Sequence, residues 1–203
     1  MKLVKRSVII HGGKEVFVLI PLDINEIVIA GHDNLGSVLI WGNDSGYRFL
    51  AECFSISAEL LNNEILYLPL KQNTSKGFNE RFHECEYNYS IICTNYCETQ
   101  LSPKEIEAIL KIKVWTEEII NRTPKINTEY IDHWKAKRRL TVKIHKKNMY
   151  ISTNRHGYHS LTCGANDLME YEGKTIEDFI PHRHFDWEEN TSTSVGVTMY
   201  YIN

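Results

Sequence analysis

Runs of apolar residues, some continuous and some alternating with polar ones, dominate the first seventy positions and predict β structure. The runs "KRSVII" and "EVFVLIPL" flank "HGGK", a glycine-containing turn typical of a hairpin. The runs "NEIVIAG", "SVLIWG" and "GYRFLAECFSIS" follow and predict further strands. Because "VLIW" is apolar on both sides of its pleat, the sheet should be covered by another element on each face.

The stretch "SPKEIEAILKIKVWTEEIINRT" predicts one long central helix. Ser102 is a suitable N-cap, Pro103 occupies the first helical position, and Glu105 completes the capping-box spacing. Pro124 is expected to end the helix. The apolar residues at helical spacing are Ile106, Ile109, Leu110, Ile112, Trp115, Ile119 and Ile120. The pattern indicates a core helix that covers the sheet.

A second β-rich half is expected after this helix. The stretch "RRLTVKIHKKNMYIST" predicts a hairpin that turns at Lys146–Asn148, with Leu140, Val142 and Ile144 on one face. "GYHSLTCG" is interpreted as another strand and "TSTSVGVTMYYI" as a closing strand, and no internal repeat is recognised. The expected architecture is α+β: a β-rich N-terminal half, one long central helix and a β-rich C-terminal half. Residues 1–203 are interpreted as a single domain, and a division into two lobes near residues 122–128 stays open.

Composition and charge narrow the functional classes. The chain has 203 residues, of which 42% are hydrophobic and 24% charged, which is typical of a globular protein. The net charge of −3 argues against a general polyanion binder. The longest apolar run, "VFVLI", is too short to span a membrane. Five cysteines at irregular spacing do not suggest a disulfide framework, so we expect reduced thiols and a cytoplasmic location. The cysteines are Cys53, Cys85, Cys93, Cys97 and Cys163.

The motifs for metal or nucleotide binding are incomplete. His83, Cys85, Cys93 and Cys97 form a candidate zinc set, but the strand-like alternation of "FHECEYNYSIIC" would point them to opposite faces. Small buried cysteines explain the pattern better. "GHDNLGSV" has the glycine spacing of a phosphate loop but lacks its lysine. The sequence therefore predicts no metal, no cofactor and no catalytic residue.

Histidines nevertheless keep an enzymatic alternative open. His145, His156 and His159 with Lys143 or Lys146 could serve a histidine-based RNase, in which the substrate's 2′-OH supplies the nucleophile. The stretch from Lys135 to Lys147 holds seven basic residues and no acid, which could contact phosphates, although a solvated hairpin face gives the same pattern. Alternatively, a small zinc-dependent hydrolase could use the four residues His156, His159, His182 and His184.

The acidic counterpart lies at residues 167–189, where eight carboxylates oppose only Lys174 and Arg183 and surround several aromatic rings. Carboxylates steer a basic protein toward the surface, and rings supply the buried contact. The alternative is a solvated loop that folds its rings into its own core. The expected partner-binding residues are Glu170, Glu172, Asp178, Phe185, Asp186, Trp187, Glu188 and Glu189.

The chain is rich in Lys, Ile and Asn, which suggests an AT-rich coding sequence. In this bias, in the motif "HFDWEEN" with its surrounding acids and in its compact α+β pattern without a coherent active site, the chain resembles a family of bacterial proteins. These are the immunity proteins encoded beside contact-dependent or polymorphic toxins. The resemblance implies a toxin-neutralising protein that covers the basic active-site cleft of a nuclease with carboxylates that mimic RNA phosphates. By this resemblance Asp178, Asp186, Glu188 and Glu189 would mimic the phosphates, and Trp187 would be the anchor.

Overall fold

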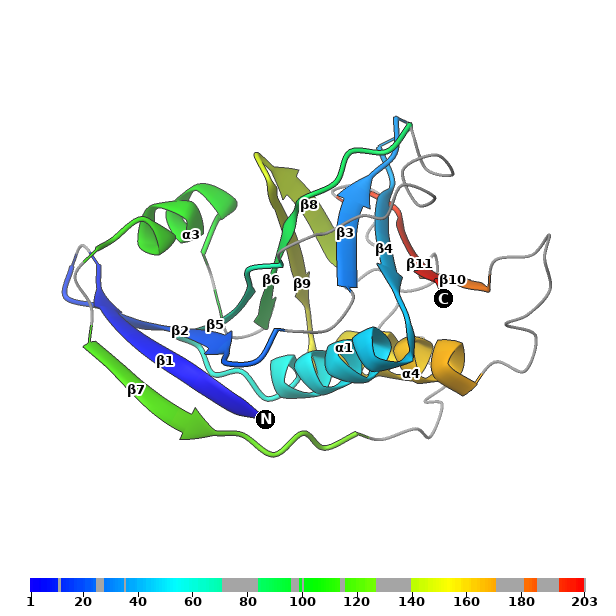
Figure 1. The fold of residues 1–203 in the computed structure, drawn as a ribbon. Coiled ribbons are helices and arrows are strands. Elements are labelled where there is room, and N and C mark those ends of the chain that lie inside the picture. Colours follow the sequence, from blue (N-terminus) through cyan, green and yellow to red (C-terminus); the bar gives the residue numbers. More distant parts are fainter. Residues whose placement is uncertain are drawn as a thin grey trace.

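The computed structural model describes residues 1–10, 12–24, 28–34, 36–70, 84–95, 99, 101–113, 116–126, 140–170, 181–185 and 194–202. Within this part of the chain, eleven strands form two sheets and are accompanied by three helices (Figure 1). The expected α+β fold class is confirmed. Among the described residues, no helix combines the length and the apolar character that a membrane span requires.

The larger sheet has seven strands in the order β7-β1-β2-β5-β6-β9-β8, and the smaller has four in the order β10-β11-β4-β3. The larger contains β1 (Lys2–Ile9), β2 (Glu15–Pro21), β5 (Glu64–Leu68), β6 (Ser90–Asn95), β7 (Thr116–Asn121), β8 (Thr141–His145) and β9 (Asn148–Thr153). The smaller contains β3 (Val28–His32), β4 (Val38–Gly42), β10 (His182–His184) and β11 (Val197–Tyr201). Parallel pairs join β2 to β5, β6 to β9 and β11 to β4, and the other pairs are antiparallel.

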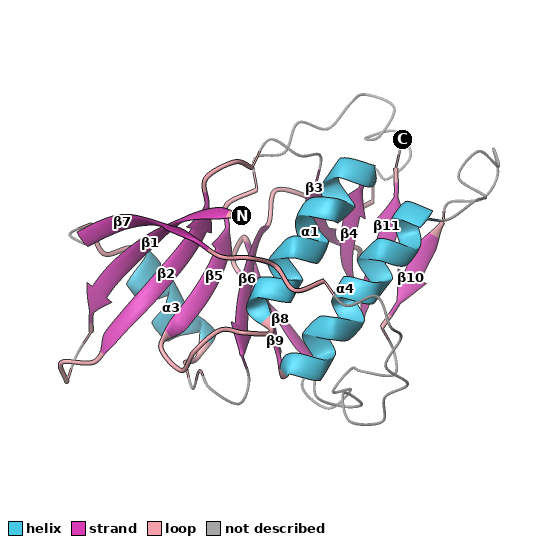
Figure 2. Ribbon diagram, turned by 90° about the horizontal axis from the view of Figure 1, so that it is seen from below, coloured by secondary structure: helices cyan, strands magenta, loops and turns pink. Residues whose placement is uncertain are grey.

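Two helices cover one face of both sheets. α1 (Asp44–Ser57) and α4 (Arg155–Glu170) lie side by side across this inner face (Figure 2). The main core forms beneath them and takes buried side chains from both helices, both sheets and both halves of the chain. α3 (Pro103–Leu110) lies on the opposite face of the seven-stranded sheet, where Ile106 and Ile109 pack in a second cluster.

The single long helix is wrong in its length, although its first part, α3, does cover a face of the sheet. The Ser102 capping box is present as expected, but α3 ends at Leu110. Residues Thr116–Asn121 form β7, which pairs with β1. Pairing with β1 therefore overrides the helical spacing of the apolar residues in this segment. The helices on the inner face come instead from "GYRFLAECFSIS" and "GYHSLTCG", both of which had been interpreted as strands.

Both inner helices begin in the same way. The side chain of Asn43 accepts a hydrogen bond from the backbone N–H of Gly46 at 2.9 Å, and Asn154 accepts one from Gly157 at 3.0 Å. Asn at this position satisfies one of the unpaired N–H groups of the first helical turn. A Cβ at Gly157 would lie 1.9 Å from Thr153 Oγ1, so this position has no room for a side chain. The pattern N-x-x-G-Y-x-x-L occurs at the start of both helices.

The tyrosine of this pattern anchors each helix to a parallel strand pair. The Tyr47 hydroxyl lies 3.2 Å from the carbonyl oxygen of Ile40 on β4 and 2.6 Å from that of Tyr200 on β11. The Tyr158 hydroxyl lies 2.9 Å from the carbonyl oxygen of Ile151 on β9 and 2.8 Å from that of Thr94 on β6. Both tyrosines are fully buried, and each hydroxyl shares its single proton between two carbonyls.

These equivalent contacts show that the chain contains an internal repeat, so the expectation of none is wrong. One unit is β3-β4-α1-β5-β6 and the other is β8-β9-α4-β10-β11, each an antiparallel pair, a helix and a second antiparallel pair. Strands also pair between the two units: β4 of the first unit pairs with β11 of the second, and β9 of the second pairs with β6 of the first. This pairing explains why side chains from both halves meet in one core.

The expected hairpins are confirmed. β1 and β2 join through Gly12 and Gly13, both with positive φ, and β8 and β9 join at Lys146, whose φ is 55°. Leu140, Val142 and Ile144 share one face and pack on the main core, as predicted. β4 is buried along its whole length, and β11 is the expected closing strand.

Candidate functional site

The short strand β10 presents two histidine rings on the outer face of the four-stranded sheet. His182 and His184 are exposed, with ring centroids 5.0 Å apart, and the His182 ring stacks on Tyr200 of β11 at 5.4 Å. The hydroxyl of Thr198 lies 2.9 Å from Nδ1 of His184. Phe185, directly after β10, is buried on the helix side, since a Cβ at Gly164 of α4 would lie 2.6 Å from its Cζ. Alternation along β10 therefore separates the rings into an outer pair and a core residue.

The outer rings continue across the sheet. Tyr200 stacks on Trp41 of β4 with a centroid distance of 6.4 Å, and Trp41 meets Tyr87 edge-on at 5.8 Å. Trp41 is fully buried, whereas His182 and His184 at the other end are exposed. We call these five side chains the ring row: His184, His182, Tyr200, Trp41 and Tyr87. The ring row combines a rigid buried base with an exposed end, which suits contact with another molecule.

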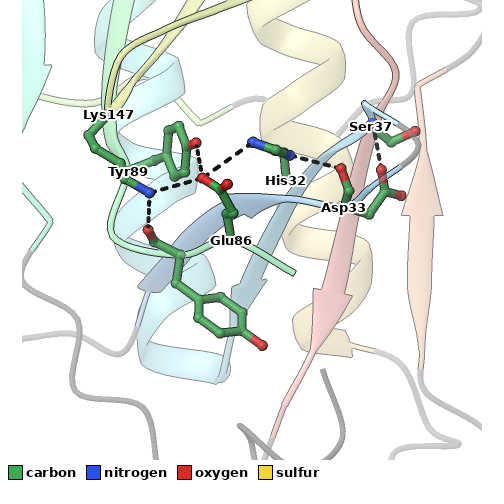
Figure 3. A network of polar contacts seen from close by, with 7 residues as sticks. His32, Asp33, Ser37, Glu86, Tyr89 and Lys147 are labelled. Atoms are coloured by element: carbon green, nitrogen blue, oxygen red, sulfur yellow. Dashed lines mark hydrogen bonds and ion pairs between the residues drawn. The ribbon is translucent and has the colours of Figure 1, made fainter. Parts of the chain in front are cut away.

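At the opposite edge of this sheet, Glu86 forms the centre of a polar network (Figure 3). Its Oε2 lies 3.0 Å from the Tyr89 hydroxyl, 3.0 Å from Lys147 Nζ and 3.6 Å from His32 Nε2. The backbone of Glu86 also pairs with His32 of β3 in both directions, at 2.9 and 2.8 Å. A Cβ at Gly31 would lie 2.0 Å from the Glu86 carbonyl oxygen, so only glycine permits this crossing.

The electrostatics of the network favour a structural role. Hydrogen bonds from Lys147 and Tyr89 lower the pKa of Glu86. Burial, followed by the hydrogen bond to Glu86, raises the pKa of Tyr89 to about 12. At neutral pH the carboxylate is therefore charged and the phenol protonated, which fixes donor and acceptor. The network ties β3 to the turn between β8 and β9, and so connects the two sheets.

The histidines of the enzymatic alternative lie in three different places. His145 Nε2 lies 3.0 Å from Glu107 of α3, on the α3 side of the seven-stranded sheet. His156 and His159 lie on α4, across the inner face. The histidines of β10 lie on the outer face of the four-stranded sheet, opposite α4. The described residues contain no group of three or more His, Cys, Asp or Glu side chains that could hold a metal ion.

The cysteines of the candidate zinc set are also separated. Cys93 is fully buried in the main core, where burial raises its pKa to about 12. Cys85 belongs to the outer cluster around Trp41. His83 and Cys97 lie outside the described residues. Cys93 is thus a core residue, as the alternation suggested.

The basic stretch is partly neutralised. Within its described part, Lys146 pairs with Glu107 and Lys147 pairs with Glu86 at 3.0 Å. Lys135, Lys137, Arg138 and Arg139 lie outside the described residues. The lysines at this turn therefore link the hairpin to α3 and to the Glu86 network.

Of the expected partner-binding residues, the structure describes two. Glu170 is the exposed last residue of α4. Phe185 is 1% exposed and belongs to the main core, so its prediction as a partner-binding residue is wrong. Its position follows from the pleat of β10, which turns it toward Gly164. The remaining residues lie outside the described part of the chain: Glu172, Asp178, Asp186, Trp187, Glu188 and Glu189.

The alternative for the acidic stretch, in which its rings fold into the protein's own core, is correct for Phe185. Sequence reasoning missed the half-buried ring of Tyr200, and it considered the exposed His182 and His184 only for a zinc site and not as a ring surface. The spacing of "HRHF" and "TMYY" places alternate residues on one face and could have indicated them. Comparison with protein-family models, with curated proteins and with solved structures finds no match.

Proposed function

We propose that this chain is a bacterial cytoplasmic immunity protein that neutralises a basic partner, a nuclease toxin domain. The observation that carries the proposal is the attachment of the acidic sequence to one strand. Residues 171–180 connect α4 to β10, and residues 186–193 follow Phe185 and lead back to β11. Both acid-rich stretches are therefore tethered to the ends of β10, whose outward rings are exposed.

Charge and shape at this strand suit a cationic protein. Residues 167–189 carry eight carboxylates, and of the two basic residues Arg183 lies 3.7 Å from Asp167 through its Nη1. A surplus of negative charge accelerates encounter with a basic cleft, and aromatic side chains supply the desolvated contact. With Phe185 in the core, His182, His184 and Tyr200 supply the ring contact in its place.

Histidine-based catalysis receives no support from the geometry. General acid/base chemistry requires two groups within hydrogen-bond reach of one substrate. His145, the α4 histidines and the β10 histidines lie on three different surfaces. A binding role uses the β10 histidines where they are and requires no convergence.

The test is complex formation with the basic domain encoded by the neighbouring gene. Purified chain and purified domain are mixed and separated by gel filtration, and we expect them to elute together at equal stoichiometry. The nuclease activity of the domain should fall in proportion to the chain added. Separate elution at micromolar concentration would contradict the proposal.

Two charge-reversal variants locate the contact. Asp186→Lys, Glu188→Lys and Glu189→Lys together should abolish co-elution, because they convert the acidic stretch to a basic one. Glu15→Lys with Asp23→Lys changes exposed acids elsewhere and should leave the complex intact. Equal loss in both variants would indicate non-specific attraction and contradict a docking surface at β10.

A further inference from the structure

The strand β7 forms an edge of the seven-stranded sheet within the described part of the chain. Met1 and Arg122 exchange backbone hydrogen bonds, with the Met1 N–H₃⁺ donating at 2.9 Å and the Arg122 N–H at 3.0 Å. In an antiparallel ladder, hydrogen-bonded pairs of residues alternate with pairs whose peptide groups point away from the partner strand. Ile120, Glu118 and Thr116 therefore turn their peptide groups toward β1. Those of Glu117, Ile119 and Asn121 turn toward the outer edge.

This edge is exposed and partly apolar. All residues of β7 are exposed except Ile120, which is half-buried, and 67% of Ile119 is accessible. An exposed strand edge with a β-branched apolar residue favours pairing with another strand. The two carboxylates that would oppose such pairing form ion pairs within the chain. Oε1 of Glu118 lies 2.9 Å from Nζ of Lys5, and Oε1 of Glu117 lies 2.6 Å from Nε of Arg6.

We propose that β7 pairs with β7 of a second copy of this chain, antiparallel and across a twofold axis at Ile119. Antiparallel pairing requires outward peptide groups to meet outward peptide groups, and the register centred on Ile119 is the one that pairs all three of them within the strand: Glu117, Ile119 and Asn121. Ile119 then lies opposite Ile119 of the second copy, Glu117 opposite Asn121, and Glu118 opposite Ile120. No carboxylate lies directly opposite another carboxylate, so the strand is complementary to itself.

The same register extends an apolar row. Val4 of β1 lies between Ile20 of β2 and Ile119 of β7 in adjacent register positions. In the dimer, Ile20, Val4 and Ile119 continue into Ile119, Val4 and Ile20 of the second copy on one face of a continuous sheet. Cross-strand pairs of β-branched residues stabilise such sheets. The edge lies in the larger sheet, away from β10, so this dimer does not depend on the proposed function.

Sedimentation velocity over a micromolar dilution series tests the dimer. We expect a species with twice the chain mass of 23.7 kDa that dissociates on dilution. Ile119→Lys places two ammonium groups opposite each other and should raise the dissociation constant about tenfold or more. Ile9→Lys is the matched control, since Ile9 is 73% exposed but not on β7, and it should dimerise like the wild type.

A second variant gives a positive signal. Ile119→Cys should form a covalent dimer under oxidation, because the two side chains face each other at the axis, whereas Ile9→Cys should not. A monomer at every concentration, or a dimer that Ile119→Lys leaves unchanged, overturns the proposal. Cross-linking of Ile9→Cys at the same rate as Ile119→Cys also overturns it.

Discussion

Removal of a single hydroxyl from each inner helix tests the internal repeat. Tyr47→Phe and Tyr158→Phe keep the buried ring and delete the oxygen that bonds two strand carbonyls, at 3.2 and 2.6 Å for Tyr47 and at 2.9 and 2.8 Å for Tyr158. Each variant loses a buried hydrogen bond and leaves carbonyl oxygens without that donor. The expected cost is about 1–3 kcal/mol of unfolding free energy for either tyrosine.

Urea denaturation followed by circular dichroism measures this cost. With a slope of about 3 kcal/mol/M, the midpoint should fall by roughly 0.3 to 1 M in both variants. Tyr67→Phe serves as the control, because the structure gives the half-buried Tyr67 no hydrogen bond within the described residues, and its midpoint should stay near that of the wild type. If one variant loses stability and the other matches the control, the two helix anchors are not equivalent and the reasoning is refuted.

Phe185→Ala should cost about 3–5 kcal/mol in urea denaturation because Phe185 is buried; a variant as stable as the wild type would place it outside the core. Gly164→Ala should destabilise by about 1–3 kcal/mol, since its Cβ would lie 2.6 Å from Phe185 Cζ, and Phe185→Leu should recover part of that loss; no recovery would exclude this contact as the cause. Glu107, held by Lys111, Lys146 and His145, has its pKa lowered to about 2 from an ordinary 4.5. Its ionised form therefore stabilises the fold above pH 4.5, and this contribution is lost as the pH falls toward 2. The urea midpoints of the wild type and of Glu107→Gln should converge over that pH range. A difference in midpoint that does not change with pH would contradict the lowered pKa of Glu107.

The strands could be predicted from sequence where local pattern and tertiary structure agree. The alternation in β8 and β9, the glycine turn between β1 and β2 and the apolar run of β4 each predict a strand, and each is one. The capping box at Ser102 likewise marks the start of α3 correctly. In these segments, turn chemistry and periodicity act over a few residues and need no distant partner.

The strand-like appearance of the α1 segment follows from the burial of its second half. Asp44, Ser45, Arg48 and Glu52 are less buried and recur at helical spacing, but residues 53–57 are all buried, so the polar stripe that marks a surface helix does not continue to the end of the helix. The caps at Asn43 and Asn154 were the usable signal. The prediction for the β7 segment was wrong because its apolar residues have helical spacing, yet the segment pairs with β1, more than a hundred residues away in the chain.

For the candidate site, too, local properties could be predicted from the sequence and tertiary placement could not. Sequence alone identified the acidic stretch and the rings within it, because charge and composition are local properties. It could not place Phe185 in the core, since that depends on the pairing of β10 with β11 and on the glycine of α4. It also could not show that the histidines lie on three different surfaces, because their separation depends on how the strands and helices are arranged.

The central claim is that the chain binds a basic protein through the surface at β10. Isothermal titration of the neighbouring gene's basic domain into the wild type and into the lysine variant of Asp186, Glu188 and Glu189 tests it most directly. We expect equimolar binding that weakens with added salt in the wild type and no measurable heat of binding in the variant. Equal affinity for both proteins would contradict it.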